Sequence, residues 1–214
     1  MNIKSLSVAL GIALSATTMS ASAQKVFTEG KVVYSASVMG RQTEATNYFK
    51  GDSSVTIQQN GPANIKIINN SKTDYFAVVV DVPVANIKKA AVATPAEVEE
   101  VNAQMPEFAF TPSTETKVIN GFNCKKVVAK DSKSGKSYDI WITNDIKAPL
   151  GTAEKLFGKA GGFPVQFTVV QNGAEVTNIL KSIDATKAPA GSFGIPAGFD
   201  RITLTELKAM SGGR

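Results

Sequence analysis

The single cysteine is the first residue of this chain that could do chemistry. Cys124 is followed by Lys125 and Lys126, and neighbouring cations can lower the pKa of a thiol and make it nucleophilic. In a strand, however, the next side chain points to the opposite face, so Lys125 would lie away from the sulfur. The alternative is a small buried side chain with both lysines in solvent, and the alternation favours it. A lone cysteine also excludes an internal disulfide.

The chain contains no histidine, and this absence excludes several kinds of site. Nucleophilic systems that use histidine as the base cannot form. The absence also excludes a haem held by histidine and, with only one cysteine, zinc sites built from histidine and cysteine. A single thiol cannot hold an iron–sulfur cluster. The chain has no Asp-x-Asp-x-Asp-Gly run, which is the pattern of a calcium-binding loop. We therefore expect no catalytic residues, no metal site and no cofactor, and we do not expect an enzyme.

Two further patterns resemble functional motifs but have a simpler interpretation. A Gly-Lys-Ser sequence begins at Gly135, but a phosphate-binding loop needs another glycine five residues earlier, where the chain has Lys130. We interpret this sequence as a solvated hairpin turn. Glu97, Glu99 and Glu100 lie together, yet they fall in the first turns of a predicted helix, where the helix dipole favours negative charge. We therefore assign them no acid–base chemistry.

The only tryptophan lies in residues 137–143, which alternate as a strand. Tyr138 would point to one face of this strand and Trp141 to the other. Trp141 has polar neighbours on its own face, so it could line a ligand groove or cap the sheet beneath a helix. Both interpretations stay open from the sequence.

A short helix is predicted over Pro95–Gln104 by its terminal signals. Thr94 is a capping residue, proline occupies the first helical position, and Glu97 completes a capping box. The apolar residues fall at helical spacing: Val98, Val101 and Met105. A ligand held between this helix and a sheet would contact this apolar stripe and the aromatic residues of the strand. The candidate ligand-binding residues are therefore Trp141, Tyr138, Val98, Val101 and Met105.

Most of the remaining chain alternates with a period of two, which is typical of half-buried strands. The predicted strands cover residues 30–39, 43–49, 54–59, 64–68, 74–80, 116–119, 123–130, 137–143, 165–171 and 175–183. A second short helix opens at Gly151, and residues 202–210 are predicted as either a strand or a short helix. We expect an α+β fold in which one or two short helices lie on one face of a curved antiparallel sheet.

The N-terminus has the layout of a secretory signal over residues 1–23. A positive charge is followed by an apolar run from Leu6 to Met19, and Ala21-Ser22-Ala23 forms a small-residue cleavage site. The run is too short and too rich in serine and threonine to span a bilayer, and no later segment is apolar enough to do so. We expect cleavage after Ala23, a single β-rich domain over residues 24–214, and a periplasmic or extracellular location.

The charge balance argues against a nucleic-acid partner. The formal net charge is +5, from 23 lysine and arginine residues and 18 aspartate and glutamate residues. The lysines are scattered among the acids, whereas nucleic-acid binding needs a basic stripe, usually with interleaved aromatic residues. We expect no nucleic-acid partner.

Several short pieces of the sequence occur together in the order seen in one protein family. They are Gly30 with Val33-Tyr34, Tyr48-Phe49-Lys50-Gly51, Gly121-Phe122-Asn123-Cys124-Lys125-Lys126, Tyr138 with Trp141 and Thr143, and Phe193-Gly194-Ile195-Pro196 with Gly198-Phe199. From Gly30 to Leu207 the chain resembles a family of exported Gram-negative proteins known only as a domain of unknown function. Members often have tyrosine at the positions of Phe122 and Phe199.

This resemblance carries implications for fold and function. It implies a relationship to the lipoprotein-carrier fold of the periplasm, a half-open antiparallel barrel whose mouth is closed by helices. That fold holds acyl chains in an apolar concavity. The family has no established catalytic residues, so none is carried over to this chain.

Two expectations about function follow. The first is an envelope protein that binds an apolar or acylated ligand, such as a lipid or the acyl chain of a lipoprotein, between the concave sheet and the helix over residues 95–104. The alternative is an envelope protein–protein interaction module without a ligand pocket. A ligand binder predicts an open apolar concavity. An interaction module predicts a filled interior and an exposed apolar patch or a free strand edge.

Overall fold

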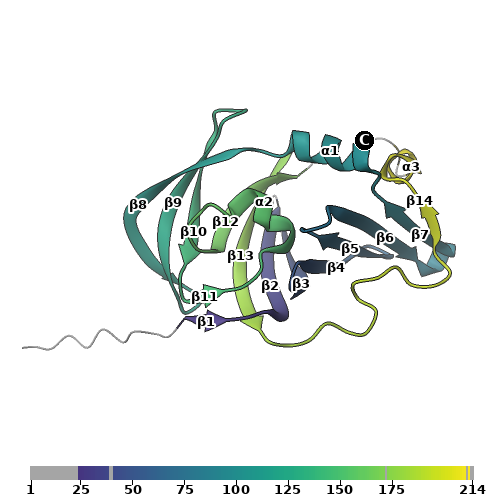
Figure 1. Cartoon of the computed structure of the whole chain (residues 1–214), viewed down its shortest axis with the longest axis horizontal. Helices are drawn as coiled ribbons and strands as arrows, with labels where there is room; N and C mark the ends of the chain where they lie inside the picture. Colours follow the sequence, from purple (N-terminus) through teal and green to yellow (C-terminus); the bar gives the residue numbers. More distant parts are fainter. Residues whose placement is uncertain (1–23, 39–40, 172, 211, 213–214) are drawn as a thin grey trace, which may run out of the picture.

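The computed structural model describes residues 24–38, 41–171, 173–210 and 212. The predicted signal segment, residues 1–23, lies outside the described residues. Within the described part the chain is mostly β structure with three short α-helices (Figure 1). None of these helices is long and apolar enough to cross a membrane.

The strands fall in two runs, separated by the helix that follows β7. They are β1 (Lys25–Val26), β2 (Glu29–Val38), β3 (Arg41–Lys50), β4 (Ser53–Asn60), β5 (Ala63–Asn70), β6 (Tyr75–Val82), β7 (Ile87–Val92), β8 (Phe108–Ile119), β9 (Phe122–Asp131), β10 (Ser137–Thr143), β11 (Ile146–Lys147), β12 (Phe163–Gln171), β13 (Ala174–Asp184) and β14 (Asp200–Ile202). The helices are α1 (Pro95–Gln104), α2 (Glu154–Phe157) and α3 (Leu204–Met210), with the short 3-10 turns η1 (Pro83–Ala85) and η2 (Gly151–Ala153).

Twelve strands form one open sheet in the order β14-β7-β6-β5-β4-β3-β2-β13-β12-β10-β9-β8. Among the described strands, β8 and β14 are its two edges and do not pair with each other. Neighbours are antiparallel except β14, which lies parallel to β7, and β1 and β11 form a separate parallel pair. The purely antiparallel sheet expected from sequence is therefore wrong in this detail. After β13 the chain runs through residues 185–199 to the far end of the sheet, and such a long crossing allows a parallel arrival.

The helix over Pro95–Gln104 is confirmed with the predicted bounds. The Thr94 hydroxyl accepts a hydrogen bond from the Glu97 amide at 3.3 Å, and the Glu97 carboxylate accepts one from the Thr94 amide at 2.9 Å. A similar box at Thr203 and Glu206 begins α3. Residues 202–210 were predicted as either a strand or a short helix, and most of them form α3, so the described chain has three α-helices where one or two were expected on the sheet.

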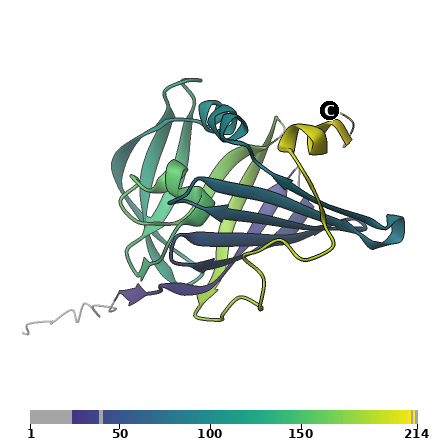
Figure 2. The same cartoon turned by 45° about the vertical axis from the view of Figure 1, so that its right-hand side comes forward.

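Strands β4 to β7 bury apolar side chains on the face that we call the outer face. The buried residues are Val55, Ile68, Ala77, Val79 and Ala90. Phe193, Ile195 and Phe199 pack against them from the segment between β13 and β14, which crosses these strands in Figure 2. Residues at alternate positions, such as the paired Thr56 and Ile67, point to the opposite, inner face.

The other end of the sheet packs on its inner face. The buried residues there include Val127, Ala129, Ile140 and Ile142 of the sheet and Phe157 of α2. Figure 1 shows α2 between the two halves of the sheet. Gly151 permits this close approach, because a Cβ at this position would lie 2.5 Å from the Ser54 hydroxyl on β4 and because its φ of +57° favours glycine.

Helix α1 links two distant parts of the sheet. It follows β7, which lies next to the edge strand β14, and it precedes β8, which is the opposite edge. The connection therefore passes over the open side of the sheet, as Figure 1 shows. This placement puts α1 opposite the inner face.

Candidate functional site

A cavity of about 1020 Å³ lies between the inner face of the sheet and the helices α1 and α2. Its lining comes from both halves of the sheet, and alternate residues of the first strands contribute. The residues from β2, β3 and β4 are Val32, Tyr34, Ala45, Asn47, Phe49, Ser54, Thr56 and Gln58. The first half of the sheet thus presents its outer face to a packed core and its inner face to the cavity.

An aromatic wall forms one side of the cavity. The Phe157 ring of α2 lies 4.7 Å from the Phe167 ring of β12 and is stacked 6.2 Å from Phe108 of β8, measured between ring centroids. The Tyr34 ring meets Phe167 edge-on at 5.5 Å. All four rings line the cavity. They give it apolar surface that a hydrocarbon chain could contact.

The polar groups in the lining are largely engaged with the protein itself. The Tyr34 hydroxyl donates to the Pro164 carbonyl at 2.9 Å, and burial raises the Tyr34 pKa far above its usual range. On β3 and β4, the Thr56 hydroxyl donates to the Asn47 side chain. Asn178 donates to the Val176 carbonyl at 3.2 Å. Because these groups are satisfied, the cavity does not need a strongly polar ligand.

One end of α1 is attached to the loop between β9 and β10. The Lys133 ammonium donates to the carbonyls of Ala103 and Met105 at 2.6 and 2.7 Å, where the helix ends. The loop itself is held by Asp131, whose carboxylate accepts from the Ser134 hydroxyl at 2.5 Å and from the Lys133 amide at 3.1 Å. The Ser134 hydroxyl and these amides lower the pKa of Asp131.

The other end of α1 is attached to α3 through one carboxylate. Glu97 caps its own helix through Thr94 and also accepts from the Thr205 amide at 2.8 Å and the Thr205 hydroxyl at 2.7 Å. The hydrogen bonds from Thr94 and Thr205 lower the pKa of Glu97 to about 2. The helix that covers the cavity is therefore fixed at both ends by polar contacts.

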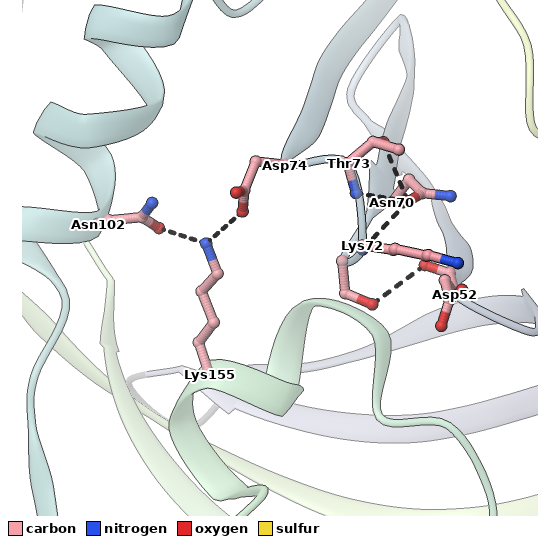
Figure 3. A network of polar contacts seen from close by, with 8 residues as sticks. Asp52, Asn70, Lys72, Thr73, Asp74, Asn102 and Lys155 are labelled. Atoms are coloured by element: carbon pink, nitrogen blue, oxygen red, sulfur yellow. Dashed lines mark hydrogen bonds and ion pairs between the residues drawn. The ribbon is translucent and has the colours of Figure 1, made fainter.

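A smaller cavity of about 230 Å³ lies between α1 and the turn between β5 and β6. It shares four lining residues with the larger one, Phe76, Val101, Met105 and Gly151. Lys155 of α2 lies beside it and donates to Asp74 of the turn and to Asn102 of α1 (Figure 3). In the same turn, the Asn70 side chain accepts from the Lys72 and Thr73 amides.

The structure brings together four of the five candidate residues. Tyr138, Val101 and Met105 line the larger cavity, and Val98 lines the smaller one together with Val101 and Met105. Trp141 is elsewhere: its side chain is 9% exposed in a core cluster with Cys124 and Val165. The Lys117 ammonium lies 4.0 Å above the Trp141 ring, a cation–π contact.

The buried interpretation of Cys124 is confirmed. Its side chain is 1% exposed, and burial raises the pKa of the thiol. Lys125 is exposed as expected, but Lys126 is largely covered and forms ion pairs with Glu115 at 2.5 Å and Asp139 at 3.1 Å, so the expectation of both lysines in solvent is wrong for Lys126. In the described part of the chain, no group of three or more cysteine, histidine or acidic residues is arranged to hold a metal ion.

Sequence reasoning missed much of the cavity lining. Phe157 and Phe167 come from segments that look like ordinary core, and Lys133 and Lys136 come from the loop interpreted as a solvated turn. The lysines of this loop were the feature that could have indicated a role at the cavity. A lysine-rich hairpin can turn toward a cavity as well as toward water. Its direction depends on the bend of the sheet, which alternation does not encode.

The chain is similar to a protein family and to a number of solved structures. The family described as "Domain of unknown function (DUF4412)" matches residues 16–199. Two structures of PNGF-II, in C2 and P21 space groups, are each 18% identical, with TM-scores of 0.50 and 0.52. These matches cover 85% and 86% of this chain but 32% and 33% of those chains, so this chain spans about a third of their length. At this identity the likeness concerns the fold alone.

A third solved structure is much less similar to this chain. A DUF1329 family protein from Desulfovibrio piger ATCC 29098 is 10% identical over 80% of this chain and 86% of its own. Its TM-score of 0.24 is too low to support an argument about fold or function. No match was found among curated protein sequences.

Proposed function

The chain belongs to the DUF4412 family, and we propose that it binds an apolar or acylated ligand in the cavity between its open sheet and α1. The observation that carries this proposal is the cavity itself, about 1020 Å³ with lining from both halves of the sheet and from both helices. This volume lies at the upper end of the range for small-molecule sites. A lipid or the acyl chain of a lipoprotein has the matching chemistry.

Helix α1 supports an apolar ligand. Its full length is described and contains no buried residue, although Val98, Val101 and Met105 face the two cavities. Val101 is 39% exposed. The apolar stripe of a helix normally packs against a core. A ligand in the cavities would cover this stripe, and each methylene group that it buries contributes about 0.8 kcal/mol.

We further propose that the open sheet is a half-barrel of the lipoprotein-carrier type. The support is its organisation: an unclosed sheet, a cavity against its inner face, and a helix that passes over its open side. The envelope is the proposed location, because residues 1–23 fit a secretory signal. Binding without catalysis is proposed because Cys124 is buried and its thiol pKa is raised.

A protein–protein interaction module is the second candidate, and the free edge of β8 favours it. Within the described residues β8 pairs only with β9. However, Pro112 lacks an amide hydrogen, the register shifts between Pro112 and Thr116, and Glu115 and Lys117 add charge to the strand. Such features protect edge strands from pairing with other chains. We therefore rank ligand binding first.

Native mass spectrometry tests the proposal directly. The protein is purified without detergent, and any bound molecule is extracted and identified. A stoichiometric lipid or acylated peptide supports ligand binding. A clean apo mass that is unchanged after incubation with envelope lipids would contradict it and favour the interaction module.

A further inference from the structure

The cavity has a charged rim, and we infer that this rim selects ligands whose apolar chain ends in an anionic head group, with Lys136 as the contact. The inference rests on the proposed function and specifies the ligand class. The head group is a carboxylate or a phosphate, because either offers oxygen acceptors and negative charge to an ammonium group.

Charged side chains line only one part of the larger cavity within the described residues. Its charged lining residues are Asp131, Lys133 and Lys136. All three belong to the end of β9 and the loop that leads to β10. The remaining lining is apolar or neutral, so the charge is concentrated at one place on the rim.

Two of these three charged groups are engaged by the protein itself. Asp131 accepts hydrogen bonds from its own loop and from the Glu107 amide at 3.2 Å, and Lys133 donates to two carbonyls at the end of α1. The Lys136 ammonium forms no hydrogen bond or ion pair with any described residue. In the smaller cavity, Lys155 is paired with Asp74 at 2.8 Å. Among the described residues that line the rim, Lys136 thus has the ammonium group that remains free for a ligand.

The distance from Lys136 to the apolar end of the cavity suits an extended ligand. Lys136 precedes Ser137, the first residue of β10, and Thr143 at the other end of β10 pairs with Phe163 of β12. Phe163 also lines the cavity. A strand rises about 3.3 Å per residue, so the two ends of β10 lie roughly 20 Å apart. The lining from Lys136 to Phe163 therefore spans a distance of this order, which is long enough for a single alkyl chain with its head at Lys136.

The size of the effect follows from the exposure of the rim. Lys136 is exposed, so an ion pair there is weakened by solvent and by salt. We expect an anionic head group to improve binding by about fivefold, within the range of exposed ion pairs. The advantage shrinks as the ionic strength rises.

Calorimetric titration of the full-length protein with matched amphiphiles tests the inference. The probes share a dodecyl chain and are dodecanoate, dodecyl phosphate, dodecanol and dodecyltrimethylammonium, each used below its micellar concentration. Dodecanoate and dodecyl phosphate are expected to bind about fivefold more tightly than dodecanol, and the cation is expected to bind most weakly. Comparing the two anions distinguishes a fatty-acid carboxylate from a lipid phosphate as the preferred head.

Two variants locate the effect. Lys136→Met removes the preference for the anions and keeps the binding of dodecanol. Lys130→Met is the matched control, since Lys130 is an exposed lysine of the same hairpin outside the cavity lining, and this variant keeps the preference. Equal loss in both variants would show that overall charge sets the preference and would overturn the role of the rim.

The outcomes separate this inference from the proposed function. Equal binding of all four probes to the unmodified protein overturns the head-group inference and leaves apolar binding in place. Absence of binding for every probe contradicts the proposed function itself. Preference for the anions that survives Lys136→Met would also reject Lys136 as the contact.

Discussion

The ammonium group of Lys155 lies 2.8 Å from the Asp74 carboxylate and so joins α2 to the turn between β5 and β6. The same group donates to the Asn102 side chain of α1 at 3.0 Å, so three elements meet beside the smaller cavity (Figure 3). The Lys155 and Asp74 side chains are 43% and 60% exposed. Such an exposed pair contributes about 1 kcal/mol or less to the free energy of unfolding. We therefore expect the Lys155 side chain to act mainly on the position of α1, through its hydrogen bond to Asn102.

Replacement of Lys155 by methionine is expected to loosen α1 while leaving the fold intact. The variant keeps most of the side-chain volume but loses both contacts, so α1 amides should exchange hydrogen faster. The free energy of unfolding should fall by about 1 kcal/mol or less. Hydrogen exchange and urea unfolding measure the two effects. Lys159→Met, which alters an exposed lysine beyond α2, serves as the control, and unchanged α1 exchange in Lys155→Met would contradict the idea.

The strands that were predicted best are those with one packed face. Val55 alternates with polar neighbours because its face is covered by residues 185–199. The alternation in the sequence therefore indicated the strand. Strand β7 was missed because Lys88 and Lys89 interrupt its apolar pattern, and its place depends on pairing with β6 and β14. The first half of β8 was missed because Pro112 breaks the pattern.

The candidate site was predicted only where helical spacing defined it. The stripe at Val98, Val101 and Met105 was visible because a capped helix has one apolar side. Trp141 could not be placed, since alternation tells which residues share a face but not which face encloses a cavity. The bend of the sheet and the passage of α1 over it decide that question, and both arise from contacts between distant segments.

The Glu97 carboxylate makes stability depend on pH in the acid range. Its pKa is about 2 in the folded protein and near 4.5 ordinarily, so its contribution is fully present above pH 4.5 and is lost as the pH falls through about 2. Glu97→Gln should be less stable than the unmodified protein at neutral pH, and the difference should shrink between these two pH values. Urea unfolding at a series of pH values measures this. Glu99→Gln, on the same helix, provides the comparison, and a constant difference across the range would reject the assignment.

The Tyr34 hydroxyl connects β2 to β12 across the intervening strand β13. Tyr34→Phe removes its hydrogen bond to the Pro164 carbonyl and should lower the free energy of unfolding by about 1 to 2 kcal/mol. Tyr48→Phe, on the opposite face of the sheet, should change stability by less than about 0.5 kcal/mol. Chemical denaturation of both variants checks this. Equal effects would contradict a special role for the Tyr34 hydroxyl.

The Cys124 thiol should be protected from reagents in the folded protein. It is 1% exposed, and burial raises its pKa, so little thiolate is available at neutral pH. A colorimetric thiol reagent should modify it slowly in buffer and rapidly in concentrated guanidinium chloride. Fast labelling without denaturant would show a reactive cysteine and would reopen the question of thiol chemistry.

A large side chain that projects from β3 into the cavity should prevent ligand binding without unfolding the protein. Ala45 lines the cavity and pairs with Tyr34 on the inner face. Ala45→Phe places an aromatic ring in the space proposed for the ligand, and it should weaken dodecanoate binding by at least about tenfold. Stability should be kept or slightly raised, because a filled cavity gains apolar contacts.

The matched control for this variant is Thr46→Phe, which adds the same ring to the same strand but on the outer face. It should bind dodecanoate as the unmodified protein does. Calorimetric titration and thermal unfolding of both variants distinguish blocked binding from lost folding. If Ala45→Phe is folded and still binds dodecanoate with unchanged affinity, the ligand does not occupy this cavity. The amphiphile would then have to bind elsewhere, and the exposed apolar stripe of α1 would not be explained by ligand binding.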